Sequence, residues 1–232
     1  MRLFIALLVA LLAWSNSYAQ SEYKLETIAE GLNFPWSIAF LPNGSYLVAM
    51  RSGEVRSITA DGLVSEPLSG LPDSYVMSQG GYFDITLDPN FAANSKVYLS
   101  FAFGTPDENA TRIVSGTLDG NRVSNVAPIF TVSPLKDTPV HYGGKMQFLN
   151  DGTLMMTTGD GFEYREAAQD PFNLMGKIIR INSDGTIPTN TPCADGRQGH
   201  PAVWSYGHRN PQGLVLDSST GNIYAHEHGA QG

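Results

Sequence analysis

Residues 146–157 read MQFLNDGTLMMT, two short apolar runs on either side of Asn150-Asp151-Gly152. Asn, Asp and Gly favour the backbone angles of a tight turn, so the stretch predicts a β-hairpin. The same pattern occurs three more times, as IAFLPNGSYLVA from Ile38, ITLDPNFAANSKVYLS from Ile85 and LVLDSSTGNIYA from Leu214. A hairpin that returns four times predicts an all-β protein built from one repeated unit.

The spacing of these hairpins indicates the architecture. The copies begin 47 to 68 residues apart, and EVRSI (54–58), RIVSGTL (112–118) and KIIRI (177–181) can supply further strands. Repeats of this kind form propeller blades, because each sheet needs neighbours to cover its faces. We expect about four blades within residues 20–232, the N-terminal part of a single longer β-propeller. A complete four-bladed ring or an open β-sandwich is the alternative.

The composition narrows the class of protein. The chain has 232 residues, a net charge of −8 and one cysteine, Cys193. An acidic chain is a poor match for nucleic acid or anionic membranes. A lone cysteine is either a free thiol or half of a bridge to another chain, so no internal disulfide framework is expected.

The first nineteen residues predict export. Arg2 precedes an almost wholly apolar stretch over 3–14, and Ser17-Tyr18-Ala19 resembles a signal-peptide cleavage site. Cleavage after Ala19 would leave a periplasmic or secreted protein with a net charge of −9, because Arg2 is lost. The alternative, an anchoring helix, would need about 20 apolar residues. No later segment is long and apolar enough to span a membrane.

The ends of the central hairpin carry the first candidate site residues. His141 precedes its first strand and Asp160 follows its second, in the stretches HYGG and GDG. Antiparallel pairing brings the two ends together, where the imidazole could accept a proton and the carboxylate could orient it. The alternative is a strand-end histidine beside an ordinary turn.

Two later loops carry further candidates. In GHRNPQG (207–213), Arg209 offers a guanidinium suited to a carboxylate or a developing oxyanion. It could equally form a structural ion pair. In EHGAQG (227–232), glycine-rich backbone could turn its carbonyls toward a hard cation such as Ca²⁺, although no EF-hand or zinc pattern is present. Gln79, before two glycines, could bind a polar ligand or simply belong to a turn.

Taken together, these stretches resemble a known family. GLNFPWSIAFLPNG, QGGYFDITLDPNF, HYGGKMQFLNDGTLMMTTGDG, LMGKIIRINSDGTIP, WSYGHRNPQGLVLD and HEHG occur in this order from about residue 24 onward. They are similar to the soluble pyrroloquinoline quinone (PQQ)-dependent sugar dehydrogenases of the glucose/sorbosone and aldose sugar dehydrogenase type. The resemblance implies an exported six-bladed propeller that holds PQQ and Ca²⁺, oxidises the anomeric hydroxyl of aldoses to lactones, and passes electrons to an external acceptor.

The resemblance also implies roles for individual residues. His141 corresponds to the general base, Asp160 to its carboxylate partner, and Arg209 to the arginine near the reactive quinone carbonyl. Arg209, Asn210 and Gln79 correspond to cofactor contacts. The carbonyls of Gly229 and Ala230 correspond to the ligands of the Ca²⁺ ion.

The sequence departs from the family pattern in three respects. Ala230 stands where many relatives have proline, and Val140 stands where glucose-binding relatives can have an acid. The last two blades of the family, with basic groups for the PQQ carboxylates, have no counterpart within the 232 residues, so we expect this chain alone to be inactive. A Ca²⁺-dependent propeller hydrolase such as a lactonase, and a non-catalytic binding propeller, are the other function classes to test.

Overall fold

The computed structural model describes residues 23–229, which are almost entirely β-structure. Strands of this part of the chain form four antiparallel sheets, and two helices of four and five residues each connect two strands of one sheet. No helix among these residues has the length and apolar character to cross a membrane. The expected signal peptide (1–19) and the expected metal ligand Ala230 lie outside the described residues.

In the first two sheets, strands that follow one another along the chain lie next to one another in the sheet. The first contains three strands, β1 (Pro35–Phe40), β2 (Tyr46–Met50) and β3 (Glu54–Ile58). The second contains four, β4 (Tyr82–Leu87), β5 (Lys96–Gly104), β6 (Asn109–Asp119) and β7 (Arg122–Thr131), with α2 (Phe91–Asn94) between β4 and β5.

The other two sheets complete the described chain. The third contains β8 (Gly143–Phe148), β9 (Leu154–Thr158), β10 (Lys177–Ile181) and β11 (Val203–Tyr206), with α3 (Arg165–Gln169) between β9 and β10. The fourth is the hairpin of β12 (Pro211–Leu216) and β13 (Ile223–Glu227). All four repeated sequence stretches therefore form antiparallel strand pairs, and EVRSI, RIVSGTL and KIIRI add the expected strands.

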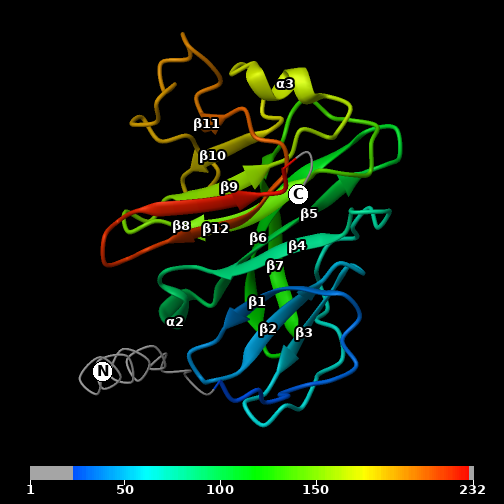
Figure 1. Ribbon diagram of the computed structural model, residues 1–232. Helices are drawn as coiled ribbons and strands as arrows, with labels where there is room; N and C mark the ends of the chain where they lie inside the picture. The colour runs from blue at the N-terminus through cyan, green and yellow to red at the C-terminus, as the bar shows by residue number, and fades with distance from the viewer. Residues whose placement is uncertain (1–22, 230–232) are drawn as a thin grey trace, which may run out of the picture.

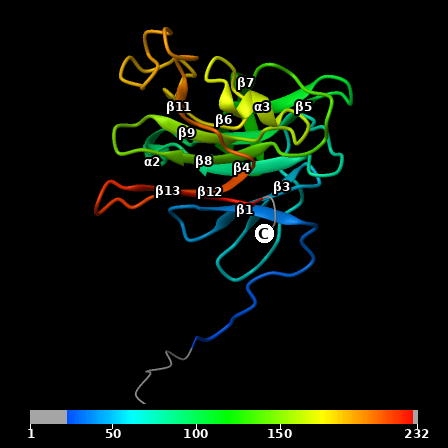
Figure 2. The same ribbon diagram turned by 45° about the horizontal axis from the view of Figure 1, so that its top comes forward.

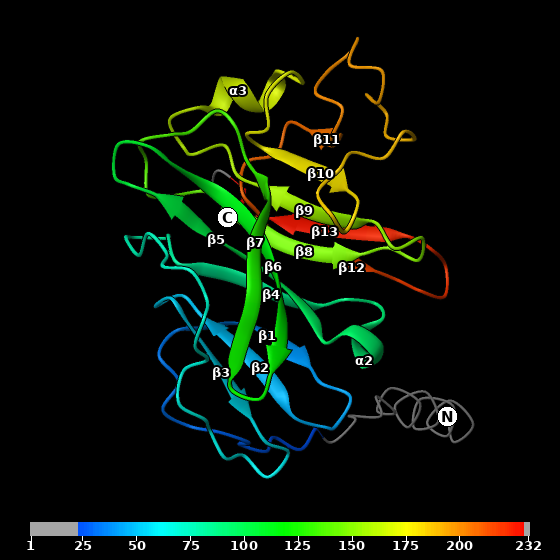
Figure 3. The same ribbon diagram turned by 180° about the vertical axis from the view of Figure 1, so that it is seen from behind.

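The sheets are arranged as consecutive blades. The first strand of each sheet contacts the first strand of the next, β1 with β4, β4 with β8 and β8 with β12. Figure 1 shows the sequence of sheets from β1–β3 to the β12–β13 hairpin, and Figure 2 shows that hairpin beside β8 and β9. The view from behind shows β6 and β7, the outer strands of the second sheet (Figure 3). This arrangement confirms the expected propeller architecture.

Apolar side chains fill the spaces between neighbouring sheets. One core joins the first and second sheets and includes Leu47, Val55, Tyr82, Leu99 and Phe101. A second core joins the second and third sheets and includes Tyr98, Ile113, Met146, Met156 and Ile179. Such burial is the main stabilising contribution to a repeated β-structure, since no single blade covers its own faces.

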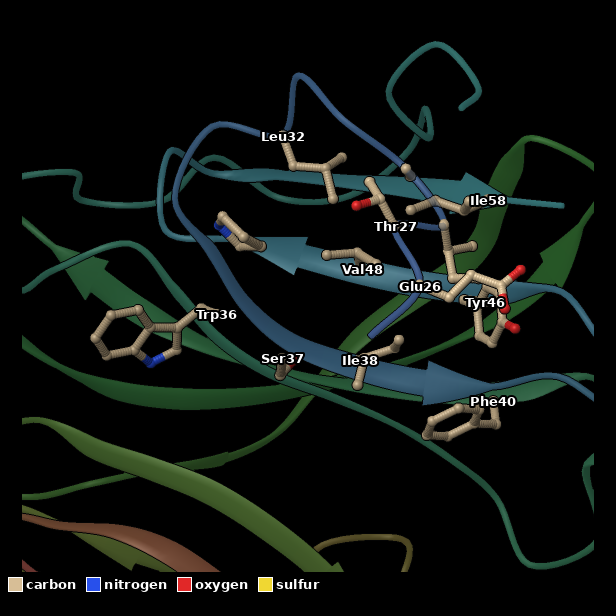
Figure 4. A pocket seen from close by; sticks show the side chains of 13 residues that line it. Glu26, Thr27, Leu32, Trp36, Ser37, Ile38, Phe40, Tyr46, Val48 and Ile58 are labelled. Carbon is tan, nitrogen blue, oxygen red and sulfur yellow. The ribbon is translucent and has the colours of Figure 1, made fainter. Parts of the chain in front are cut away.

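The outer face of the first sheet is open. Trp36, Ile38 and Phe40 alternate along β1 and are each about half exposed or more, whereas Ala39 is buried against the second sheet. Figure 4 shows this face beneath the 26–32 segment, where a groove of about 630 Å³ is lined by residues including Leu32 and Val48. Trp36 is exposed because no sheet of the described residues packs on that face.

The single cysteine has a clear environment. Cys193 is a free thiol and only 8% exposed. It lies in the loop between β10 and β11, where a Cβ added to Gly199 would be 3.1 Å from its sulfur. Of the two interpretations from the sequence, the structure therefore favours the buried free thiol over a bridge to another chain.

Candidate functional site

The central hairpin brings His141 and Asp160 into direct contact. His141 lies two residues before β8 and Asp160 two residues after β9, and the pairing of Gly143 with Thr158 places these ends together. His141 Nδ1 is 2.7 Å from Asp160 Oδ1, and both side chains are about 5% exposed or less. The predicted histidine–carboxylate pair is therefore present in the structure.

The hydrogen bonds of Asp160 orient the imidazole and favour one of its tautomers. Asp160 Oδ1 also accepts a hydrogen bond of 2.8 Å from the backbone N–H of Phe162, while the Phe162 ring meets the imidazole edge-on at 5.3 Å between centroids. An ionised carboxylate can only accept, so this contact favours the His141 tautomer with its proton on Nδ1. The lone pair of His141 Nε2 is then the one available to accept a proton.

Unusual backbone angles concentrate around this pair. Among the described residues, six other than glycine have positive φ, and three of them are Ser78 (φ 52°), His141 (φ 50°) and Phe162 (φ 68°). Such conformations are uncommon and cost free energy unless the surrounding structure holds them. Here they point to a segment that is fixed for the placement of side chains rather than for stability.

Gln79 lies against the same segment. Its Oε1 accepts a hydrogen bond of 2.8 Å from the backbone N–H of His141, and its own backbone N–H donates to the carbonyl of Pro139 at 3.1 Å. The sequence left open whether Gln79 was a ligand contact or a turn residue. The structure shows that it holds the strained backbone of His141, which places it within the cluster.

The GHRNPQG loop contacts the hairpin from the other side. The backbone N–H of Asp160 donates to the carbonyl of Arg209 at 2.8 Å. Asn210 is 3% exposed, and its Oδ1 accepts from the backbone N–H of Gly143 at 3.1 Å. Asn210 thus joins the fourth sheet to the first strand of the third, beside His141.

The expected metal loop is adjacent to this arginine. Nη1 of Arg209 donates to the carbonyl of His228 at 3.3 Å, one residue before Gly229. No group of three or more His, Cys, Asp or Glu side chains that could hold a metal occurs within residues 23–229. Backbone carbonyl oxygens are ligands that Ca²⁺ accepts readily.

Glu227, which the sequence reasoning overlooked, joins these loops. Its Oε2 accepts from the backbone N–H groups of Arg209 at 2.6 Å and Asn210 at 3.2 Å. Its Oε1 is 3.4 Å from His208 Nδ1, and His208 Nε2 is 2.8 Å from Ser205 Oγ. An acidic residue directly before the glycine-rich loop was the signal that could have identified it.

A second overlooked residue supports the hairpin from behind. Lys136 is 5% exposed, and its Nζ donates to Asn109 Oδ1 at 3.0 Å and to the carbonyl of Thr138, while lying 3.5 Å from the centroid of the Tyr142 ring. Burial lowers the pKa of Lys136 to about 7. Since Tyr142 follows His141 directly and Thr138 Oγ1 donates to the carbonyl of Gly161, this network fixes both ends of the hairpin.

A third overlooked residue lies beneath the arginine loop. The ammonium of Lys177 is fully buried and donates to the carbonyls of Ala167, Ala168 and Met175. Burial lowers the pKa of Lys177 to about 8. Because Ala168 also accepts from the backbone N–H of Gly207, this lysine connects α3 to the start of the GHRNPQG loop.

Fold and site together define a class: a β-propeller with a histidine–carboxylate pair, a nearby arginine and a glycine-rich loop at one end of its strands. A family profile described as Glucose / Sorbosone dehydrogenase matches residues 32–232. The chain belongs to this family. It is 34% identical over 231 residues to the aldose sugar dehydrogenase YliI of Escherichia coli, covering 97% of this chain and 62% of that protein. It is 37% identical over 230 residues to the uncharacterized protein slr1608 of Synechocystis, covering 92% and 56%.

Solved structures give the same result. A structure titled glucose dehydrogenase superposes with a TM-score of 0.86 at 37% identity, covering 90% of this chain and 66% of that one. The PQQ-bound form of aldose sugar dehydrogenase from Streptomyces coelicolor superposes with a TM-score of 0.74 at 30% identity, covering 88% and 59%. The chain thus spans roughly 60% of the length of the relatives it matches.

Proposed function

We propose that this chain forms part of an exported, PQQ-dependent aldose dehydrogenase that converts the anomeric hydroxyl of a sugar to a lactone. The observation that supports this most strongly is the contact path from His141 through Asp160 to Arg209 and on to the carbonyl of His228. These contacts support a site in which a proton acceptor, a guanidinium and a backbone carbonyl act together at one end of the strands. The proposal includes periplasmic or secreted localisation and an external electron acceptor.

The proposed reaction removes two hydrogens from the sugar. Oxidation of a hemiacetal removes a proton from the anomeric oxygen and a hydride from the anomeric carbon. His141 Nε2 takes the proton, and Asp160 stabilises the imidazolium that results. Bound PQQ together with Ca²⁺ would supply the electrophile for the hydride. Arg209 would stabilise the negative charge that the cofactor gains.

The residues present fit such a cofactor in their chemistry. Arg209 suits an anionic quinone, and the carbonyls of Gly229 and Ala230 would hold Ca²⁺. The side chains of Gln79 and Asn210 accept from the backbone N–H groups of His141 and Gly143, and their amide groups would face a polar cofactor from there. The side-chain clusters expected of a Ca²⁺-dependent hydrolase do not occur within residues 23–229. We therefore favour the dehydrogenase over the lactonase.

The test uses the complete gene product, reconstituted with PQQ and Ca²⁺. Reduction of an artificial dye acceptor is measured with several aldoses, with His141→Gln and Arg209→Ala beside the wild type. We expect cofactor-dependent turnover that falls at least about 100-fold in His141→Gln, the usual size of a general-base contribution. Lack of any PQQ-dependent turnover would reject the function, and full activity of His141→Gln would reject the role of the base.

A further inference from the structure

The Glu227 side chain accepts hydrogen bonds from two backbone N–H groups that the strand ladder leaves without a partner. The β12–β13 ladder begins with the pair Pro211 and Glu227. β12 begins at Pro211, so the backbone N–H groups of Arg209 and Asn210, just before it, lie outside the ladder. The Glu227 carboxylate accepts both of them, at 2.6 and 3.2 Å.

The contacts also run in the opposite direction. While Glu227 holds the backbone of Arg209, the guanidinium of Arg209 reaches back to the carbonyl of His228, the residue after Glu227. The two segments therefore fix each other. The orientation of the His228 carbonyl, which directly precedes Gly229, is therefore linked to the position of the arginine.

The same loop is joined to the imidazole. Asp160 donates its backbone N–H to the carbonyl of Arg209, and Asn210 accepts from Gly143. A displacement of the 209–210 backbone would therefore also displace Asp160 and the first strand of the His141 hairpin. Glu227 is the residue through which the carbonyl loop, the arginine and the imidazole share one backbone framework.

We propose that Glu227 is a positioning residue that couples the cation-binding carbonyl loop to Arg209 and, through it, to the His141–Asp160 pair. The inference rests on the proposed function and adds a regulator of site geometry to it. Glu227 touches neither the sugar nor the quinone in this role. Outer residues that orient metal ligands typically contribute 10- to 100-fold to metal affinity or activity.

The experiment compares Glu227→Ala and Glu227→Gln with Asp217→Ala in the complete gene product. Asp217 lies at the far end of the same hairpin, where its carboxylate accepts from Ser219 and Thr220. Loss of Asp217 weakens the hairpin without touching the loop, so it controls for stability alone. Glutamine retains an acceptor for the two N–H groups but not the charge.

The first readout is Ca²⁺ binding to the protein without PQQ, measured by calorimetric titration. We expect Glu227→Ala to bind Ca²⁺ about 10- to 100-fold more weakly than the wild type. Glu227→Gln should fall between the two, and Asp217→Ala should bind like the wild type. Equal losses in Glu227→Ala and Asp217→Ala would show that Glu227 only stabilises the hairpin.

The second readout separates this proposal from the function itself. With PQQ and Ca²⁺ at saturation, Glu227→Ala should lose about tenfold or more in kcat with a smaller change in the KM for sugar, since a misplaced arginine acts on the transition state. If wild-type kcat and Ca²⁺ affinity persist in Glu227→Ala while Arg209→Ala is impaired, the coupling is wrong and the function stands. If the wild type binds no Ca²⁺ and shows no PQQ-dependent turnover, the function itself fails, and the coupling with it.

Discussion

Replacement of Asp160 by asparagine should separate the charge of this residue from its geometry. Asp160 Oδ1 accepts from both His141 Nδ1 and the Phe162 N–H. An asparagine that keeps its carbonyl oxygen in that place still accepts both, and the opposite orientation would set its amide against the Phe162 N–H. The variant should therefore keep the tautomer and the turn and lose only the negative charge.

The magnitude follows from Coulomb's law, with a charge separation somewhat longer than the 2.7 Å Nδ1–Oδ1 contact because each charge is delocalised over its group. Two unit charges about 4 Å apart interact by about 4 kcal/mol at an effective dielectric constant near 20, which corresponds to roughly a 1,000-fold change in rate. The imidazolium is only partly formed in the transition state, so we expect kcat of Asp160→Asn to fall about 100- to 1,000-fold. Its free energy of unfolding should remain within about 1 kcal/mol of the wild type, because both hydrogen bonds persist.

Asp160→Ala provides the contrast. It removes the charge and leaves two buried donors without an acceptor, so it should lose about 2 to 4 kcal/mol of stability in addition to activity. Steady-state dye reduction and denaturant unfolding measure the two quantities, with Asp217→Asn, in the exposed turn between β12 and β13, as a control. The reasoning is refuted if Asp160→Asn keeps more than about a third of the wild-type kcat, or unfolds as easily as Asp160→Ala.

Three further predictions concern the packing around the site. Gly159→Ala should lower the free energy of unfolding by about 3 kcal/mol or more, because the added Cβ would lie 2.1 Å from the carbonyl oxygen of His141. Gly152→Ala, whose Cβ would have no atom within 4 Å, should lower it by only about 1 kcal/mol. Thermal or denaturant unfolding measures both. The pKa of Lys136 is lowered to about 7, so between this pH and the ordinary pKa of lysine the unfolded chain binds more protons than the folded chain. The free energy of unfolding therefore rises with pH in this range. In denaturant titrations, that of the wild type should rise by about 2 kcal/mol relative to that of Lys136→Met from pH 7 to pH 9. Equal differences at the two pH values would contradict a buried, uncharged amine. The Cys193 thiol should react with a chromogenic disulfide only upon unfolding, and rapid reaction of the native protein would contradict its burial.

Local sequence patterns were sufficient to predict the hairpins and their main site pair. The Asn150-Asp151-Gly152 turn sets the register of the central hairpin, and an antiparallel register brings its two ends together by geometry alone. The His141–Asp160 contact was therefore predictable from spacing. Its contact with Arg209 was not, because it depends on the packing of one blade against the next.

The buried lysines and Glu227 could not be predicted in the same way. Lys136 and Lys177 are surrounded largely by backbone carbonyls and an aromatic ring, and these groups carry no signature in the sequence. Glu227 binds backbone N–H groups, which every residue except proline possesses. Such partners are defined only when the chain has folded, so charged residues beside a motif remain ambiguous until the structure is known.

The distribution of strain gives a physical reason for these supporting contacts. Ser78, His141 and Phe162 all have positive φ at the end of the hairpin where the imidazole lies, and each such conformation costs about 1 to 3 kcal/mol. The hydrogen bonds that Gln79 and Asp160 accept from the backbone N–H groups of His141 and Phe162 can offset that cost only if this segment is itself held in place. The Lys136 network fixes the backbone at Tyr142 and Gly161, and the Glu227-bound loop fixes the backbone of Asp160. The site thus depends on polar contacts between neighbouring sheets, and a change that loosens one contact should reduce activity before it reduces stability.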